Sequence, residues 1–350
     1  MRWLVTGGAG FIGSNFVRLL LCERPDATVV NVDLLTYAGN LENLRDVEKD
    51  PRYSFVRGDV ADPAAWGASV GALPDVVVHF AAETHVDRSI EDAHPFLRTN
   101  VIGTQAMLQW TRDKGVPRFL QVGTDEVYGS LEPDDPPFTE SSPLQPNSPY
   151  AASKCSADLL VRAAVHTHGL HAVTTRCSNN YGPWQFPEKF LPLMITNALH
   201  DLALPVYGDG QQRRDWIHVD DHNRAVVLAA ERGTRGAVYN IGGAGGERTN
   251  LSVLGQLLDL VGKPRSLIRH VQDRPGHDRR YAIDSSHACA ALGWEPRVDF
   301  AEGLRATVDW YVANREWWGR VKSGAYRSYY ESMYGSRLAA SRPAAGPGNP

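Results

Sequence analysis

The stretch Trp3-Leu4-Val5-Thr6-Gly7-Gly8-Ala9-Gly10-Phe11-Ile12-Gly13-Ser14 leads from a short apolar run directly into a glycine-rich loop. Apolar residues then recur at helical spacing at Phe16, Leu19 and Leu20, so the order is strand, glycine loop and helix. In this arrangement backbone N–H groups can approach a pyrophosphate at the helix N-terminus, and Gly13 lets the helix pack close to the strand. Because glycine-rich turns are common, the pattern needs support from elsewhere in the chain.

That support comes from a second apolar run, residues 29–32, which ends at Asp33, about 20 residues after Gly13. Asp33 is placed to accept hydrogen bonds from ribose hydroxyls and to repel a 2′-phosphate. The segment after it, Leu34-Leu35-Thr36, includes no arginine, so the sequence predicts NAD and not NADP as the cofactor. The cofactor contacts predicted in these two segments are Gly7, Gly10, Phe11, Ile12, Gly13, Asp33, Leu34 and Thr36.

Two further strands are predicted, over residues 53–57 and 75–80. We expect Asp59, just after the first of them, to reach the adenine; a solvated loop aspartate is the alternative. The second strand leads into two alanines, whose small side chains allow a cofactor to approach closely. The alternation of strands and helices predicts an α/β fold with a Rossmann-like, doubly wound parallel sheet. The cofactor contacts predicted after these strands are Asp59, Val60, Ala81 and Ala82.

A long helix is predicted over residues 92–114, with the polar residues Thr99 and Asn100 near its middle. Buried polar groups at such positions need partners, so we interpret Asn100 as a structural bridge and not as a catalyst.

The stretch Gly123-Thr124-Asp125-Glu126-Val127-Tyr128-Gly129 follows a very apolar run, residues 118–122, that reads as a buried parallel strand. Thr124, Asp125 and Glu126 therefore emerge at its carboxyl end, where open α/β sheets hold their ligands. Two adjacent carboxylates cost repulsion and desolvation. Either opposite charges neutralise the pair, or one carboxyl stays protonated as an acid while the other acts as a base.

A helix is predicted over residues 150–168, opened by Ser148 and Pro149. It carries Tyr150 and Lys154 one turn apart, on the same face. A cation beside a phenol favours the phenolate, so we expect this pair to take part in the chemistry.

The composition limits the classes of partner. The chain has 350 residues, of which 43% are hydrophobic, and this is enough for a sizeable core. A net charge of −4 without a block of Lys or Arg argues against nucleic acids and membrane surfaces as partners. The cysteines have no CxxC spacing, which favours a reducing cytoplasm over a disulfide framework or a zinc site. We predict a cytoplasmic protein without a metal site; its cysteines are Cys22, Cys155, Cys177 and Cys289.

From Ser178 onward the regular alternation of strands and helices weakens, and a smaller C-terminal α/β substrate-binding lobe is predicted. We expect an NAD-binding domain over residues 1–178 and a mainly substrate-binding lobe over 179–337, with the chain recrossing between them. A disordered tail is predicted over 338–350. The lobe places cations on three separate segments, as a diphosphate-bearing ligand would require, at Lys189, Arg214 and Arg274.

Together these motifs resemble the extended short-chain dehydrogenase/reductase family, and within it the dTDP-glucose 4,6-dehydratases, over residues 1–311. The glycine loop and the Tyr150–Lys154 pair occur throughout that superfamily. The segment Thr124-Asp125-Glu126 distinguishes the dehydratases from the epimerases of the family, because epimerases typically carry small hydroxyl residues in place of the acidic pair. Thr84 departs from the family's serine but keeps the hydroxyl. Other matching segments are 81–89, 179–183, 187–189, 213–216 and 273–278.

The resemblance implies conversion of dTDP-glucose to dTDP-4-keto-6-deoxyglucose and water, with NAD recycled, in deoxysugar biosynthesis. It implies that Tyr150 takes the proton of the sugar 4-hydroxyl as a hydride leaves for NAD, that Lys154 anchors the ribose, and that Thr124 hydrogen-bonds the 4-oxygen. It further implies that Glu126 removes the proton at carbon 5 while Asp125 protonates the departing 6-hydroxyl. The hydride then returns to carbon 6.

The same resemblance implies the remaining contacts. Further cofactor contacts are Thr99, Tyr150, Lys154 and Asn180. Substrate contacts are Thr84, His85, Thr124, Asn179, Glu188, Lys189, Pro205, Tyr207, Arg214, Asn250, Arg274 and His277. The family's usual state implies a homodimer joined through the helices predicted over 92–114 and 150–168; the second offers the face Leu159, Leu160, Arg162 and Ala163.

Two alternatives are open. A nucleotide-sugar 4-epimerase or reductase would need no acid–base pair beyond Tyr150 and Lys154, and Asp125-Glu126 argues against it. A non-catalytic NAD-binding regulator would carry a degraded catalytic set, whereas Thr124, Tyr150 and Lys154 are all present.

Overall fold

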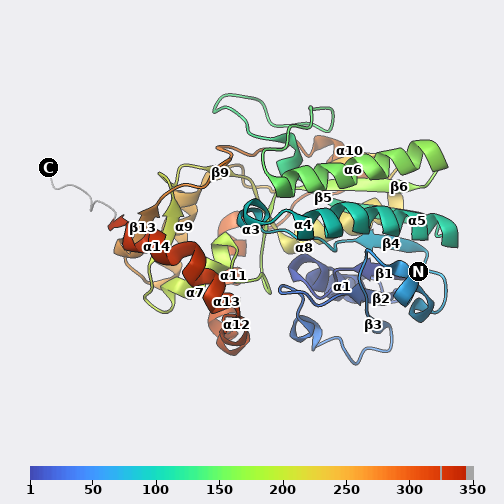
Figure 1. Ribbon diagram of the computed structural model, residues 1–350, viewed down its shortest axis with the longest axis horizontal. Coiled ribbons are helices and arrows are strands. Elements are labelled where there is room, and N and C mark those ends of the chain that lie inside the picture. Colours follow the sequence, from blue (N-terminus) through green and yellow to red (C-terminus); the bar gives the residue numbers. More distant parts are fainter. Residues whose placement is uncertain (324, 344–350) are drawn as a thin grey trace.

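The computed structural model describes residues 1–323 and 325–343. Its larger unit is built on a seven-stranded sheet whose strands are all parallel (Figure 1). Across the sheet the strands are β11 (Val238–Ile241), β6 (Ala172–Cys177), β5 (Arg118–Thr124), β4 (Val76–His79), β1 (Arg2–Thr6), β2 (Thr28–Asp33) and β3 (Tyr53–Arg57). The predicted Rossmann-like sheet is therefore confirmed.

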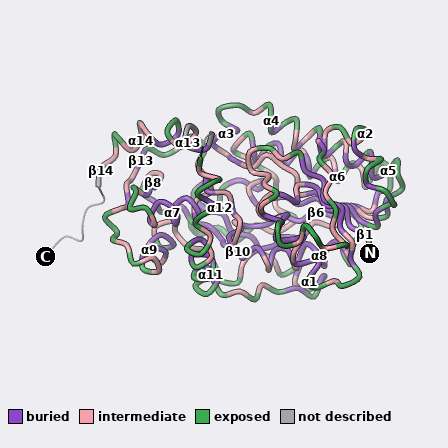
Figure 2. Tube along the Cα trace, turned by 90° about the horizontal axis from the view of Figure 1, so that it is seen from below, coloured by how far each residue is buried: buried purple, intermediate pink, exposed green. Residues whose placement is uncertain are grey.

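Helices cover both faces of the sheet (Figure 1). Successive strand side chains point to opposite faces, so Trp3 and Val5 pack on one side while Leu4 packs on the other. The first face is covered by α1 (Phe11–Glu23), α8 (Val219–Arg232) and α10 (Ser286–Leu292). The second is covered by α2 (Pro63–Trp66), α5 (Thr104–Lys114) and α6 (Pro149–His168). The central strands are buried on both sides, as Figure 2 shows, which explains their continuous apolar runs.

A smaller lobe with its own apolar core stands at one end of the sheet (Figure 1). Its helices are α7 (Phe190–Ala198), α9 (Asn250–Val261), α11 (Phe300–Ala313), α12 (Arg315–Val321), α13 (Ala325–Tyr330) and α14 (Ser336–Ala339). A three-stranded sheet joins β8 (Leu204–Tyr207), β13 (Ile268–Val271) and β14 (Arg342–Pro343). Two strand pairs complete it, β7 (Asn179–Tyr181) with β10 (Trp216–His218) and β9 (Arg213–Arg214) with β12 (Arg248–Thr249).

The chain crosses between the two units after residue 178. Strand β11 lies beside β6 in the large sheet, and α8 packs against α1, although both follow the first strands of the small lobe. The residue boundaries given above for the two domains stay predictions.

The helix predicted over residues 92–114 is present from His94 to Lys114 and includes a π-helical segment. Asp92 ends a separate helix, α3 (Val86–Glu91), and its Oδ1 accepts a hydrogen bond of 3.0 Å from the N–H of His94. The chain continues through α4 (His94–Phe96), a π-helical segment over Leu97–Gly103, and α5. Within that segment the Nδ2 of Asn100 donates to the Ser153 hydroxyl at 2.8 Å and to the Glu83 carbonyl at 3.0 Å. The interpretation of Asn100 as a bridge is confirmed.

The prediction of a disordered tail from residue 338 is wrong for its first part. Leu338 lies in α14 and packs against the core of the small lobe, and β14 pairs with β13. The sequence did not reveal Leu338 as a residue that packs on the core, because the segment around it is rich in small residues. Residues 344–350 lie outside the described part of the chain.

Candidate active site

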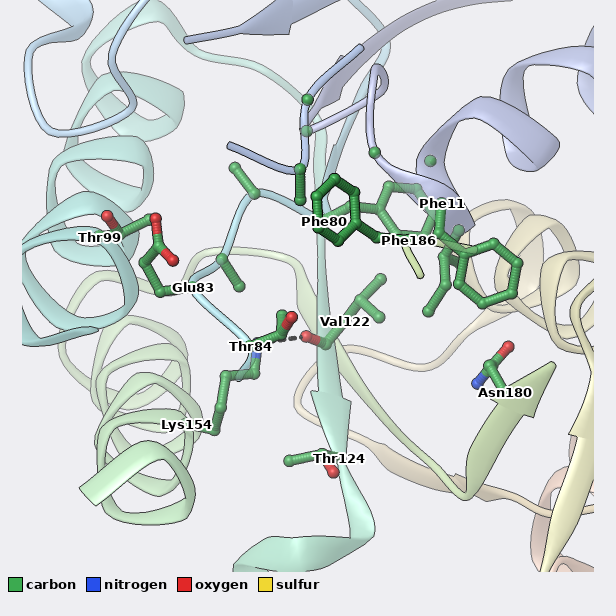
Figure 3. A pocket seen from close by; sticks show the side chains of 18 of the residues that line it. Phe11, Phe80, Glu83, Thr84, Thr99, Val122, Thr124, Lys154, Asn180 and Phe186 are labelled. Carbon is green, nitrogen blue, oxygen red and sulfur yellow. Dashed lines mark hydrogen bonds between the residues drawn. The ribbon is translucent and has the colours of Figure 1, made fainter. Parts of the chain in front are cut away.

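A cavity of about 300 Å³ opens at the carboxyl ends of β1, β2, β4 and β5. Every residue predicted to contact the cofactor lines it: Gly7, Gly10, Phe11, Ile12, Gly13, Asp33, Leu34, Thr36, Asp59, Val60, Ala81, Ala82, Thr99, Tyr150, Lys154 and Asn180. Figure 3 shows Phe11, Phe80 and Phe186 gathered on one side of this cavity, with Lys154 and Thr124 on the other. The place is the one where open parallel sheets bind ligands.

The glycine loop forms a cradle that larger residues would fill. A Cβ on Gly13 would stand 2.3 Å from the carbonyl oxygen of Gly7, and one on Gly7 would stand 2.6 Å from the backbone nitrogen of Ala81. Gly7 also has φ +72°, which L side chains rarely adopt. The loop thus brings bare backbone to the start of α1, and this fits a dinucleotide pyrophosphate.

Asp33 closes the far end of the cradle. Its carboxylate accepts hydrogen bonds from the N–H groups of Ala9 (2.9 Å) and Leu35 (2.8 Å), and burial raises its pKa. Each of its two oxygens keeps a further lone pair, so the carboxylate can still accept from ribose hydroxyls.

Thr124 ends β5, and a short 3₁₀ turn over Asp125–Tyr128 places the two carboxyl groups just beyond it. Asp125 is 3% exposed, and its Oδ2 has no hydrogen-bond partner among the described residues. Burial raises the pKa of Asp125 well above its ordinary value, and the neighbouring charges of Glu126 and Asp215 add to this. The protonated form is therefore favoured more strongly at Asp125 than at Glu126.

Glu126 has a different electrostatic environment. Burial raises its pKa too, but the positive charges of Arg274, Lys189 and Arg214 act in the opposite direction. The two carboxyls are thus unequal, since cations from three segments favour the charged form of Glu126. Such an arrangement can supply an acid and a base side by side.

Helix α6 carries Tyr150 and Lys154 into the same site. It begins after Ser148, whose hydroxyl accepts a hydrogen bond from the N–H of Ala151 at 3.1 Å. The buried Lys154 ammonium donates to the carbonyl of Val122 at 2.7 Å, as the dashed line in Figure 3 shows. Burial and the charge of Glu126 raise the pKa of Tyr150, while a hydrogen bond with Thr124 acts the other way. That Lys154 favours the phenolate stays a prediction.

Four of the predicted substrate contacts outside the catalytic group line the cavity, namely Thr84, Asn179, Glu188 and Lys189. The Lys189 ammonium donates to the carbonyl of Thr84 at 2.6 Å, and Glu188 pairs with Arg88 at 3.2 Å. These contacts join the loop before α7 to the loop after β4 and to α3.

The others lie in or toward the small lobe, outside the cavity lining: His85, Pro205, Tyr207, Arg214, Asn250, Arg274 and His277. Arg274 and Arg214 nevertheless act electrostatically on Glu126. His277 is bound to Asp273 at 2.6 Å, and burial lowers its pKa to about 4. Cations from both sets of predicted contacts therefore act on Glu126: Lys189 from the cavity lining, and Arg214 and Arg274 from the second set.

Sequence reasoning missed a group of residues around α3. The guanidinium of Arg88 lies 4.1 Å from the ring centroids of both Tyr37 and Tyr329. Asp87 accepts hydrogen bonds from Arg274 and Tyr207. Asp87 and Arg88 stand in the segment 81–89 that matched the family pattern, but their partners lie far away in the chain. The match of that segment was the feature of the sequence that could have pointed to these two residues.

Two further observations concern the described residues only. No group of three or more His, Cys, Asp or Glu side chains is placed to hold a metal ion. None of the described helices combines the length and the apolar character needed to cross a membrane.

Comparisons with known proteins agree with this geometry. The family model described as GDP-mannose 4,6 dehydratase matches residues 4–307. A dTDP-glucose 4,6-dehydratase from Actinoplanes sp. is 53% identical, over 91% of this chain and 100% of that protein. The crystal structure of DesIV, a dTDP-glucose 4,6-dehydratase from Streptomyces venezuelae with NAD and TYD bound, is 52% identical, with a TM-score of 0.88. It covers 92% of this chain and 100% of its own.

Epimerases share the fold at lower identity. A UDP-glucose 4-epimerase from Thermotoga maritima, solved with UDP-glucose, is 30% identical with a TM-score of 0.83, over 90% of this chain and 100% of its own. The higher identity to dTDP-glucose 4,6-dehydratases separates the chain from that group. The chain therefore belongs to the GDP-mannose 4,6-dehydratase family of extended short-chain dehydrogenases/reductases, and within it to the dTDP-glucose 4,6-dehydratases.

Proposed function

We propose that this chain converts dTDP-glucose into dTDP-4-keto-6-deoxyglucose and water, with NAD as a recycled cofactor. One observation carries the proposal: at the end of β5, buried Asp125 stands next to partly buried Glu126, and the two carboxyls are electrostatically unequal. Removal of water across two carbons needs an acid and a base at once, in fixed orientation.

The glycine cradle, Asp33 and the absence of arginine from the residues after Asp33 support NAD. When bound, NAD supplies a reversible hydride acceptor, so that the overall conversion carries no net change of oxidation state. Lys154 would anchor its ribose from α6.

In the first stage Tyr150 accepts the proton of the sugar 4-hydroxyl, and the Thr124 hydroxyl holds the 4-oxygen. Both side chains are buried, so water does not compete for these contacts. The pKa of Tyr150 is raised in the structure, so this stage needs positive charge at the site. The cofactor in its oxidised form adds such charge, and Lys154 adds more.

In the second stage Glu126 removes the proton at carbon 5, which the 4-keto group has made acidic. Asp125 gives its proton to the departing 6-hydroxyl, and water leaves. Afterwards Glu126 returns the proton to carbon 5. Each group does what its surroundings favour, since burial favours the protonated form of Asp125 and three cations favour the ionised form of Glu126.

The diphosphate of the substrate would bind among Lys189, Arg214 and Arg274, with the base near Pro205 and Tyr207. Glu188, Asn179, Asn250, Thr84, His85 and His277 complete the proposed contacts. The support for this set is that it surrounds the charged end of the cavity and includes the cations that act on Glu126.

Incubation with dTDP-glucose, without added reductant, tests the proposal. Mass analysis of the nucleotide sugar should show the loss of one water. A nucleotide sugar of unchanged mass but altered configuration would favour the alternative, a 4-epimerase. A 4-reductase would convert nothing under these conditions.

We further propose that the chain forms a homodimer through α6 and the helical stretch over residues 94–114 that includes α5. Large apolar side chains are exposed along this face, with Leu159 at 52%, Ile102 at 55% and Leu97 at 49%. Exposed apolar patches of this kind mark protein interfaces. Light scattering should give the mass of a dimer, and Leu159→Lys should shift the protein toward the mass of a monomer.

A cytoplasmic location also stays a proposal. It is supported by the cysteines, which are all free thiols in the structure.

A further inference from the structure

The carboxylate of Asp87 joins two residues of the small lobe. Its Oδ1 accepts a hydrogen bond of 2.9 Å from Nη1 of Arg274, and its Oδ2 accepts one of 3.0 Å from the Tyr207 hydroxyl. Asp87 lies in α3, next to the cavity residue Thr84, whereas its partners come from β8 and the loop after β13. One side chain thus ties the large unit to two separate segments of the small lobe.

The Asp87–Arg274 pair is shielded from water, with exposed side-chain fractions of 7% and 17%. A buried ion pair is costly to break, because the remaining charge is left without compensation. Arg274 is therefore held in one orientation. Its Nε has no hydrogen-bond partner among the described residues, so one donor stays available for a ligand.

Tyr207 is held from a second direction. Nη1 of Arg337, in α14, donates to the Tyr207 hydroxyl at 2.8 Å. The ring of His277 packs edge-on against the Tyr207 ring at 5.9 Å between centroids. Asp87, Tyr207 and Arg337 form a continuous chain of contacts from α3 to the last helix of the lobe.

We propose that Asp87 is a positioning residue for nucleoside diphosphate binding: it fixes Arg274 and Tyr207 in the orientation that a nucleotide sugar needs. Asp87 itself touches neither the sugar nor the cofactor in this account. Without it, both side chains would have to be ordered when the ligand binds, and that ordering costs affinity. The inference rests on the proposed function, because it assumes that Arg274 and Tyr207 contact the substrate.

The substitution Asp87→Asn tests this, since it keeps the shape of the side chain but removes its charge. We expect the Kd for dTDP, measured by calorimetry on the NAD-loaded protein, to rise about tenfold, as expected for a coupled contact. The KM for dTDP-glucose should rise by the same factor, while kcat changes less than about threefold. The matched control is Asp92→Asn at the end of the same helix, where an exposed pair with His94 is lost and no effect on Kd or KM is expected.

A double-mutant cycle with Arg274→Gln shows whether Asp87 acts through its partner. The combined effect on the dTDP Kd should fall clearly below the product of the two single effects. Independent effects, or a dTDP Kd within about twofold of wild type for Asp87→Asn, would overturn the proposal.

If Asp87→Asn does not fold, Asp87→Glu keeps the charge that buried Arg274 needs and displaces the two oxygens by one methylene. Its dTDP Kd should still rise at least about threefold; an unchanged Kd would contradict the role. Calorimetry with dTDP does not require turnover, so wild-type protein that binds dTDP without dehydrating dTDP-glucose would refute the proposed function and not this inference.

Discussion

Lys154 is tied to Val122 by a hydrogen bond of 2.7 Å from its ammonium to the backbone carbonyl, so that α6 is fastened to β5 two residues before Thr124. This bond couples the helix that carries Tyr150 to the strand that leads into the acid–base pair. The geometry needed for an oxidation at one carbon and an elimination at the next two is thereby built into rigid elements.

Substitutions in the acidic pair should separate oxidation from elimination. In Glu126→Gln or Asp125→Asn, the first hydride transfer still occurs, but the elimination slows by about 10² to 10⁴, the usual contribution of a general acid or base. In a single turnover with dTDP-glucose, NADH absorbance should therefore rise and persist. Tyr150→Phe is the opposite case, in which no NADH should form. A lack of NADH in all three variants would contradict the assigned roles.

The pH dependence of kcat/KM should depend on the charge around Glu126. The base must be ionised, so activity is lost as pH falls through the pKa of Glu126, which burial raises above its ordinary value of 4.5. Arg274 and, to a smaller extent, Lys189 and Arg214 lower this pKa, whereas Asp278 raises it. Arg274→Gln removes one positive charge and should move the acid limb of the profile to higher pH. A limb that stays in place or moves to lower pH would argue against Glu126 as the base.

The buried carboxyl of Asp125 should lower the free energy of unfolding at neutral pH. Its pKa is higher in the folded than in the unfolded state, so the folded protein binds more protons between the two values. The free energy of unfolding therefore falls as pH rises through this window. Asp125→Asn removes this cost and should raise the Tm of the NAD-loaded protein by about 2 to 4 °C at neutral pH. The gain should shrink below pH 3.8, where the unfolded chain is protonated as well; a lower Tm at neutral pH would contradict this account.

The glycine cradle should not tolerate even a methyl group. In Gly13→Ala the new Cβ would meet the Gly7 carbonyl oxygen at 2.3 Å, so the loop or α1 must shift. We expect the NAD content of the purified protein to fall at least about tenfold, because the pyrophosphate site is displaced. Gly115→Ala is a suitable control, since nothing lies within 4 Å of its Cβ, although its positive φ adds some strain. Full NAD content in Gly13→Ala would mean that the pyrophosphate binds elsewhere.

Local chemistry made much of the large unit predictable from sequence. The strand Tyr53–Arg57 begins and ends where the sequence predicts, because it is a short run bounded by polar residues and glycine. Helix α6 follows from Ser148 and Pro149 at its start and Gly169 at its end. The separate helix α3 and the π-helical segment carry no comparable local signal.

The candidate site likewise has a part that the sequence predicts and a part that it does not. The predicted cofactor contacts line one cavity, because they follow the carboxyl ends of strands whose order is fixed by the fold. The partners of Asp87 and Arg88 could not be predicted from the sequence. Tyr207, Arg274 and Tyr329 lie far from α3 in the sequence and contact it only in the three-dimensional structure. The raised pKa of Tyr150 was also missed, since neither burial nor the charge of Glu126 can be read from the Tyr150–Lys154 spacing.

The central claim is that one hydride leaves carbon 4 and returns to carbon 6 after water is lost. The most direct measurement uses dTDP-glucose deuterated at carbon 4, incubated with the NAD-loaded protein without added reductant and followed by mass and NMR analysis of the product. The account predicts a product lighter by one water that carries the deuterium at carbon 6. A product of unchanged mass, or a dehydrated product without deuterium at carbon 6, would contradict it.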